Sequence, residues 1–185
     1  MLILSKSNKT SLLLALLSLV FYSIFAYDLA RTDYVKLITL YTALFFLFYT
    51  LVKNNTINFT FLVVIGFIFR LAFLLAIPNL SQDFYRFIWD GRMILEGYNP
   101  YLYTPESFIS ESKFPVNQAK ELYIGMQRLN ASHFTNYPPI NQLCFVIAAL
   151  FANKSIVGSA MVLRLIIIAA DFGTCLLYTS PSPRD

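Results

Sequence analysis

Charged residues are scarce in this chain. Asp, Glu, Lys and Arg make up 13% of its 185 residues, whereas 57% are hydrophobic and the mean hydropathy is +0.61. A soluble domain carries about 25% charged residues, so the composition indicates an integral membrane protein. The formal charge of +4 is scattered and forms no dense Lys/Arg surface that would follow a phosphate backbone, which argues against nucleic acid as a partner.

Cysteine and histidine are also rare. Cys144 and Cys175 lie far apart, in or beside apolar segments, and His133 is the single histidine. A disulfide framework needs several cysteines, and a zinc site needs a close group of thiolate or imidazole ligands. The sequence therefore predicts neither of these two kinds of site.

Long apolar runs are what the chain has in abundance. We expect them to cross a membrane as helices, because backbone polar groups cannot face lipid unpaired and each run approaches the ~20 residues that a crossing needs. The expected spans are Ser11–Tyr27, Tyr34–Val52, Phe59–Ile77, a short Ile140–Phe151 and Ile156–Leu177. The expected fold class is all-α, a polytopic membrane protein with about five transmembrane helices in this stretch.

Basic residues in the short loops predict the orientation. Four lysines fall on one side if the spans alternate: Lys6, Lys9, Lys53 and Lys154. The short turn on the other side has one arginine accompanied by two aspartates. Because lysine and arginine collect on the cytoplasmic side, we expect a cytoplasmic N-terminus. The long polar stretch 78–137 is then an outer loop, in a periplasm or a lumen.

The beginning of this loop, Ser81–Arg92, has the densest charge of the chain. Its first serine can cap a helix with Asp83 in the first turn, and Gly97 can end that helix. Asp83 and Asp90 share a helical face with Arg86 between them. On a soluble protein, solvated ion pairs would explain this pattern. The aromatic residues around it favour a membrane boundary, so we favour a carboxylate-based site on a surface helix.

The last residues, Cys175–Asp185, are unlike the rest. They match the translation of a DNA string that resembles a transposase-type sequencing adapter. We therefore expect this tail to be non-native and residues 1–174 to be the N-terminal part of a longer transmembrane domain. The alternative is a genuine polar tail.

Four blocks of the chain resemble the polytopic mannosyltransferases of the GT-C class in order and spacing. They are residues 81–86 (SQDFYR), 89–92 (WDGR), 97–101 (GYNPY) and 137–139 (YPP). Bacterial members have D-x-Y-R-Y-x-W-D-G-R, then G-x-N-P-Y and Y-P-P. The glycosylphosphatidylinositol-anchor mannosyltransferase I is similar more distantly. The similarity covers residues 70–171.

The resemblance implies a GT-C-like fold and a membrane glycosyltransferase. Such an enzyme moves a hexose, here mannose, from a polyprenyl-phosphate donor to a hydroxyl of a lipid or glycan acceptor, with inversion, on the outer face of the membrane. Membrane lipid is a further partner. For a bacterial member the location is the inner membrane, with loop 78–137 in the periplasm.

Site residues follow from the resemblance position by position. Asp83 matches the acidic residue of the first outer loop that is taken as the catalytic base. The matched substrate-binding candidates are Asp90, Asn99, Tyr101, Tyr137 and Asp171. Where the more distant relative has the first aspartate of a D-x-D, this chain has Ser81. No metal ligands are therefore predicted, and a divalent ion is an alternative without a full D-x-D to support it.

Transfer from a sugar phosphate also needs positive charge near the departing phosphate. Three arginines are candidates because a guanidinium meets phosphate with a planar fork: Arg70, Arg86 and Arg92. Spacing prefers none of them. Arg70 lies inside the third expected span, where it either faces a wet cavity or extends toward the interface. Asp171 shares a face with Arg164 in the fifth span, so a structural ion pair is the alternative to a role in the site.

Two other functions compete with the enzyme. A transporter or lipid flippase would use Arg70, Arg164 and Asp171 to line a pathway, and it would place its polar groups in mid-membrane. This chain concentrates them in an outer loop, which favours the enzyme. A non-catalytic scaffold subunit is the third option, and it should tolerate Asp83→Asn without loss of activity in its complex.

Overall fold

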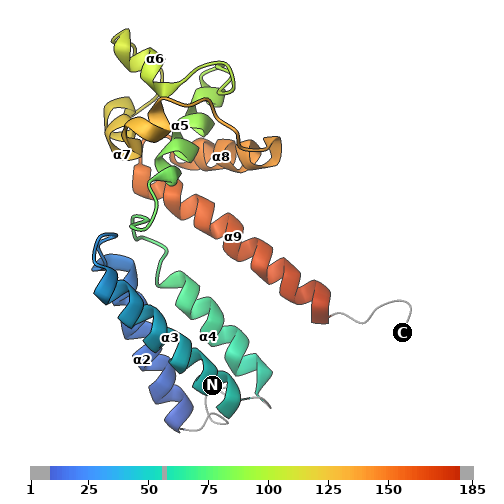
Figure 1. The fold of residues 1–185 in the computed structure, drawn as a ribbon. Helices are drawn as coiled ribbons and strands as arrows, with labels where there is room; N and C mark the ends of the chain where they lie inside the picture. The colour runs from blue at the N-terminus through green and yellow to red at the C-terminus, as the bar shows by residue number, and fades with distance from the viewer. Residues whose placement is uncertain (1–8, 56–57, 180–185) are drawn as a thin grey trace. The chain divides into compact units, whose positions relative to one another are not determined.

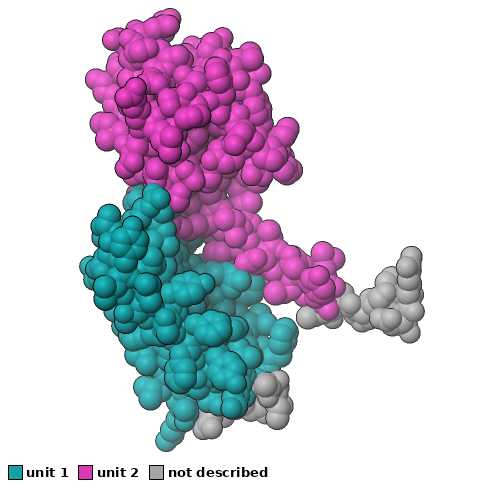
Figure 2. All heavy atoms as spheres, in the orientation of Figure 1, with its two compact units in different colours: residues 1–80 teal, residues 81–185 magenta. Residues whose placement is uncertain are grey.

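The computed structural model describes residues 9–55 and 58–179. Every regular element in these ranges is a helix (Figure 1), which confirms the all-α prediction. The chain divides into two compact units, residues 1–80 and residues 81–185 (Figure 2). Lys6, one of the four lysines behind the predicted orientation, lies outside the described residues.

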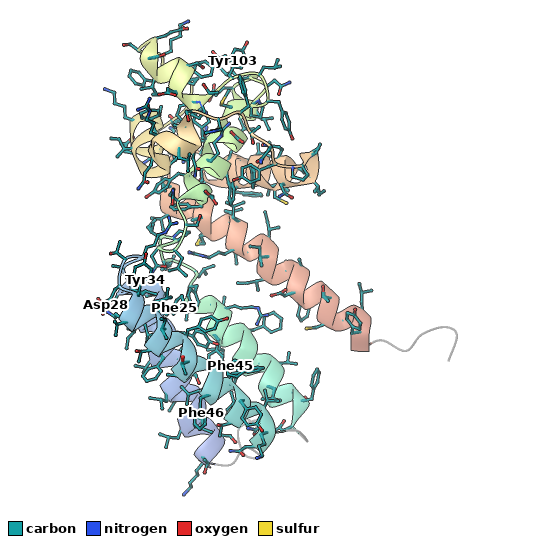
Figure 3. All side chains as sticks on the ribbon, viewed as in Figure 1. Phe25, Asp28, Tyr34, Phe45, Phe46 and Tyr103 are labelled. Atoms are coloured by element: carbon teal, nitrogen blue, oxygen red, sulfur yellow. The ribbon has the colours of Figure 1, made fainter. Side chains whose placement is uncertain are left out.

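In its described residues the first unit has three helices: α2 (Lys9–Tyr27), α3 (Tyr34–Asn54) and α4 (Phe59–Leu71). Helix α2 packs against both α3 and α4. The Asp33 side chain caps α3 by accepting from the Lys36 amide at 3.0 Å. Large apolar side chains project outward from α3, including Phe45 and Phe46 (Figure 3), which are 65% and 66% exposed. Such a surface suits lipid rather than water.

Three helices of the described ranges are long and apolar enough to cross a membrane: Lys9–Tyr27, Tyr34–Asn54 and Ile156–Tyr178. The expectation of five spans is not confirmed. The third expected span was to reach Ile77, but α4 ends at Leu71 and the chain continues in turns. The fourth corresponds to a helix of 14 residues. At 1.5 Å per residue that is about 21 Å, short of the ~30 Å hydrocarbon core.

The second unit is built around α5 (Asp83–Leu95), which packs against α7 (Ala119–Ala131), α8 (Pro139–Ala152) and α9 (Ile156–Thr179). A short helix, α6 (Pro105–Ser110), packs on α7. The core is formed by apolar side chains of α5 and α7, among them Trp89, Met93, Leu122 and Met126, all fully buried. This core holds α5 in the middle of the unit, so its polar face is positioned by the surrounding helices.

Helix α5 ends as its sequence signals predict, but it begins one residue later than a Ser81 cap would place it: Gln82 is the N-cap and its side chain makes no capping hydrogen bond. The Ser81 hydroxyl accepts from the Asp83 amide at 3.2 Å, and Gly97 follows the helix with a positive φ of 82°. At its centre, Gly91 lets α8 approach closely, because a β-carbon there would overlap the backbone carbonyl of Phe145. The rings of Phe87 and Phe145 stack at 4.7 Å beside this contact. Helix α8 therefore lies directly on α5.

Candidate active site

Asp83, the predicted base, opens α5 and is half-buried. Its Oδ1 accepts a hydrogen bond from the Asn130 side-chain nitrogen at 2.7 Å. Asn130 belongs to the last turn of α7. Among the described residues, the other carboxylate oxygen of Asp83 has no hydrogen-bond partner within the protein. One oxygen is thus fixed and the other is available to a ligand.

Arg86 and Asp90 form a buried ion pair on the same helix. Arg86 Nε donates to Asp90 Oδ1 at 2.7 Å, and the two side chains are 5% and 0% exposed. Arg86 Nη1 also donates to the backbone carbonyls of Asn130, at 2.9 Å, and His133, at 2.7 Å. Its Nη2 is buried and has no partner in the described part of the chain. Arg86 therefore ties the end of α7 to α5 and keeps one donor uncommitted.

Asp90 connects α5 to α8. Its Oδ2 accepts from Gln142 Nε2 at 3.2 Å, and the same nitrogen lies 3.3 Å from Thr135 Oγ1. Burial raises the pKa of Asp90, while the charge of Arg86 and hydrogen bonds from Thr135, Arg86 and Gln142 oppose this rise. With both oxygens bound to protein groups, Asp90 orients Arg86 and the chain that enters α8.

Arg92, one of the three phosphate-binding candidates, lies in a separate buried cage. Its Nη1 donates to the Asn117 carbonyl at 2.6 Å, and Nη2 lies 3.5 Å from the Ala152 carbonyl and 3.4 Å from Ser159 Oγ. Burial lowers the pKa of Arg92 to about 10, and Glu121 opposes the shift, so the side chain is still charged at neutral pH. The structure does not bring Arg92 to the Asp83 carboxylate. Arg92 thus bonds the segment before α7 to the C-terminal end of α8 and the first turn of α9.

The blocks GYNPY and YPP meet in space. The Tyr101 hydroxyl donates to the Tyr137 carbonyl at 2.5 Å, and Asn99 Oδ1 accepts from the Tyr101 amide at 3.0 Å. The Tyr137 ring packs edge-on against Phe87 of α5 at 4.9 Å. Burial raises the pKa of the Tyr137 hydroxyl, and the charge of Asp83 raises it further. Tyr137 is therefore close enough to Asp83 to sense its charge, and its role in lining the site stays a prediction.

A cavity of about 340 Å³ lies beside this cluster. Its lining residues come from α5, the end of α7 and the chain that leads to α8: Arg86, Leu129, Asn130, His133, Phe134, Thr135, Asn136 and Tyr137. We call it the α5–α7 pocket. Its volume is within the range of small-molecule sites, and such sites carry a few convergent polar groups. A larger cavity of about 1000 Å³ between α8 and α9 is lined mainly by apolar residues and includes none of the predicted site residues.

The two remaining predicted residues lie elsewhere. Arg70 belongs to α4 of the first unit, where its Nη1 donates to the Gly66 carbonyl at 3.1 Å. Asp171 lies in the C-terminal half of α9. Their roles stay predictions. Within residues 9–55 and 58–179, no group of three His, Cys, Asp or Glu side chains is arranged to hold a metal ion.

Sequence reasoning missed the three partners that organise this cluster: Asn130, Thr135 and Gln142. Asn130 is 47 residues from Asp83, and Gln142 is 52 residues from Asp90. No local spacing links residues so far apart. The adjoining Y-P-P block was the one signal that this part of the chain approaches α5.

Comparison with known families decides what kind of protein this is. A family model described as alpha-(1->6)-mannopyranosyltransferase, N-terminal domain, of the MptA_B family, matches residues 8–180. The chain belongs to this family. No curated protein and no solved structure matches it. Membership identifies a mannosyltransferase domain, in agreement with the resemblance seen in the four sequence blocks, and it favours the enzyme over a transporter.

Proposed function

We propose that this mannosyltransferase domain transfers mannose from a polyprenyl-phosphate donor to a hydroxyl of a lipid or glycan acceptor on the outer face of a membrane. The observation that carries the proposal is the Asp83 carboxylate: one oxygen is fixed by Asn130, a residue that lines the α5–α7 pocket, and the other has no hydrogen-bond partner among the described residues. The family description suggests an α-(1→6) linkage in the product.

Asp83 is assigned the role of general base. Its uncommitted oxygen takes the proton of the acceptor hydroxyl while the hydroxyl oxygen attacks the anomeric carbon. The bond between that carbon and the phosphate oxygen breaks, and the phosphate leaves with the electron pair. Attack from the side opposite the leaving group inverts the anomeric centre, so a β-linked donor yields the α-linked product.

Arg86 is assigned to the departing phosphate. It lines the α5–α7 pocket, and its buried Nη2 has no hydrogen-bond partner among residues 9–55 and 58–179. Its other nitrogens are held by Asp90 and two backbone carbonyls, so the guanidinium is oriented before substrate arrives. Asp90 then acts through Arg86, and Tyr137 borders the sugar. Arg70, in the first unit, stays a candidate from the sequence alone.

The membrane topology proposed here differs from a simple alternation of five spans. Both ends of α8 contact α5: Gln142 bonds Asp90 near one end, and the Ala152 carbonyl faces Arg92 at the other. Because α5 belongs to the proposed outer loop, we place α8 on the outer side of the membrane together with α5. The proposed crossings are α2, α3, the stretch of α4, and α9. Helix α4 has 13 residues and is as short as α8; it is assigned a crossing because the proposal places Lys53 and α5 on opposite sides. Lys9 and Lys53 still support a cytoplasmic N-terminus, whereas Lys154 lies outside.

The test is a transfer assay on membranes that contain the full reading frame carrying this domain. Labelled polyprenyl-phosphate mannose and labelled nucleotide mannose are compared as donors, and the former should serve. Asp83→Asn should lower transfer by about 10²- to 10⁴-fold, the range for losing a general base. Asp28→Asn makes the same chemical change at a side chain that is 77% exposed, and it should leave transfer unchanged. Equal transfer by wild type and Asp83→Asn would overturn the assignment.

A further inference from the structure

We infer that Asn130 is a positioning residue, whose carboxamide holds the Asp83 carboxylate so that its second oxygen faces the acceptor hydroxyl. The inference rests on the proposed role of Asp83 as base. Its direct support is the hydrogen bond from Asn130 Nδ2 to Asp83 Oδ1, at 2.7 Å. A carboxylate at the first residue of a helix otherwise rotates freely about its side-chain bonds, and a fixed oxygen removes that freedom.

The last turn of α7 is built to present this side chain to α5. Gly125 lets α7 approach Tyr85 of α5, because a β-carbon there would lie 2.5 Å from the tyrosine ring. Gln127 then interrupts the helix with φ 59° and ψ 168°, a conformation that non-glycine residues rarely adopt. The interruption precedes Asn130 by one helical turn. Strained backbone of this kind collects at sites where a side chain must be aimed.

The main chain of Asn130 is fastened independently of its side chain. Arg86 Nη1 donates to the Asn130 carbonyl and to the His133 carbonyl, and Asp90 holds Arg86 in turn. Asp83, Arg86 and Asp90 lie three and four residues apart on α5. One helical face therefore carries both the proposed base, Asp83, and the Arg86–Asp90 pair that holds the main chain of Asn130. Changing the Asn130 side chain should therefore leave the turn in place, which makes the inference testable.

A neutral donor is the appropriate partner for a base. Among the described residues, the charge of Asp83 also acts on the Tyr137 hydroxyl from the chain before α8, and Arg86 and Asp90 lie on the same face of its own helix. The nearby His133 imidazole is exposed and bonded to the Leu129 carbonyl. An asparagine adds a hydrogen bond without adding charge. An aspartate at position 130 would put two carboxylates at hydrogen-bond distance, and such a pair shares one proton.

The experiment compares Asn130→Ala, Asn130→Asp and the control Asn117→Asp in the full reading frame. Asn117 has an exposed side chain in the same unit, so its substitution makes the same chemical change away from the site. We expect Asn130→Ala to lower kcat by about 10- to 100-fold with the donor KM within about 2-fold, as for a misoriented catalytic group. Asn130→Asp should also move the acidic limb of the kcat profile to higher pH by about one unit or more. Asn117→Asp should match wild type in both measurements.

The outcomes separate this inference from the proposed function. Wild-type kcat in Asn130→Ala, or an unshifted pH profile in Asn130→Asp, would overturn the positioning role. If Asn130→Asp does not elute as a monodisperse protein, the test of the positioning role is the kcat of Asn130→Ala, expressed per folded molecule. Failure of both variants to fold would make Asn130 a purely structural residue, which also overturns the inference. An Asp83→Asn variant with wild-type activity would instead refute the base itself.

Discussion

Replacing Gly91 with alanine tests the packing of α8 on α5, on which the position of the site depends. A β-carbon on Gly91 would overlap the carbonyl oxygen and carbon of Phe145 and lie 3.0 Å from its β-carbon. Backbone atoms cannot rotate away, so the two helices must separate. Overpacking of this kind costs about 1–3 kcal/mol. Separation also strains the bond from Gln142 to Asp90, and a hydrogen bond to a charged group contributes about 1.5–3 kcal/mol.

The expected result is a lower thermal midpoint. A loss of about 2 kcal/mol lowers the midpoint of a protein of this size by about 4–8 °C. Unfolding can be followed through the fluorescence of Trp89, the single tryptophan of this chain, which is fully buried in the second unit. Transfer activity should fall with the midpoint, since Gln142 and Asp90 orient Arg86.

Gly173→Ala is the matched control for this substitution. Gly173 lies in α9, and a β-carbon there meets nothing within 4 Å. Alanine is favoured over glycine in a helix by about 0.5–1 kcal/mol, so the control should keep or raise the midpoint. A wild-type midpoint and wild-type activity in Gly91→Ala would refute the close contact between the two helices.

Further variants test other parts of the account. Because burial raises the pKa of Asp90 above its ordinary 3.8, the native state binds the Asp90 proton more tightly than the unfolded state does. The free energy of unfolding should therefore fall as the pH rises from 3.8 through the raised pKa. Asp90→Asn, measured by thermal unfolding at several pH values, should make this fall smaller. Tyr101→Phe removes the hydroxyl that bonds the carbonyl of the Y-P-P block and should cost about 0.5–1.5 kcal/mol of stability by thermal unfolding. Lys53→Cys, Asn117→Cys and Lys154→Cys, each in a cysteine-free background, test the topology with a membrane-impermeant maleimide. Lys154→Cys should be labelled from the same side of the membrane as Asn117→Cys and from the side opposite to Lys53→Cys. Labelling of Lys154→Cys from the same side as Lys53→Cys would instead make α8 a membrane span.

Local signals were enough to predict α5. The acidic first turn and the glycine after the helix act within a few residues, and the helix ends at Leu95 as they indicate. The predicted cap at Ser81 is off by one residue, since Gln82 occupies the N-cap position. The Arg86–Asp90 ion pair also follows from helical spacing. The burial of this ion pair cannot be predicted from helical spacing, because it depends on α7 and α8. Their contacting residues are distant in the sequence: Asn130 is 44 residues from Arg86, and Gln142 is 52 residues from Asp90.

Two of the five expected spans are not confirmed, for a different reason. Apolar composition is the same for a helix in lipid and a helix packed on another helix. The stretch from Ile140 to Phe151 is apolar and forms part of a 14-residue helix that packs on α5. That length is short for a crossing, and the fourth span stays a prediction. The stretch ending at Ile77 is apolar throughout, yet α4 stops at Leu71 and turns follow before Pro78. Hydropathy alone could not locate the packing of α8 on α5 or the end of α4 at Leu71.

The most direct test of the central claim is a single-turnover measurement on Asp83→Asn with labelled polyprenyl-phosphate mannose already bound. We expect the variant to retain the labelled donor, because Arg86 and the α5–α7 pocket are unchanged, and the rate of mannose transfer to fall by about 100-fold or more. A wild-type rate of transfer from the bound donor would contradict the role of Asp83 as base. Loss of donor binding with an unchanged rate per bound donor would contradict it equally.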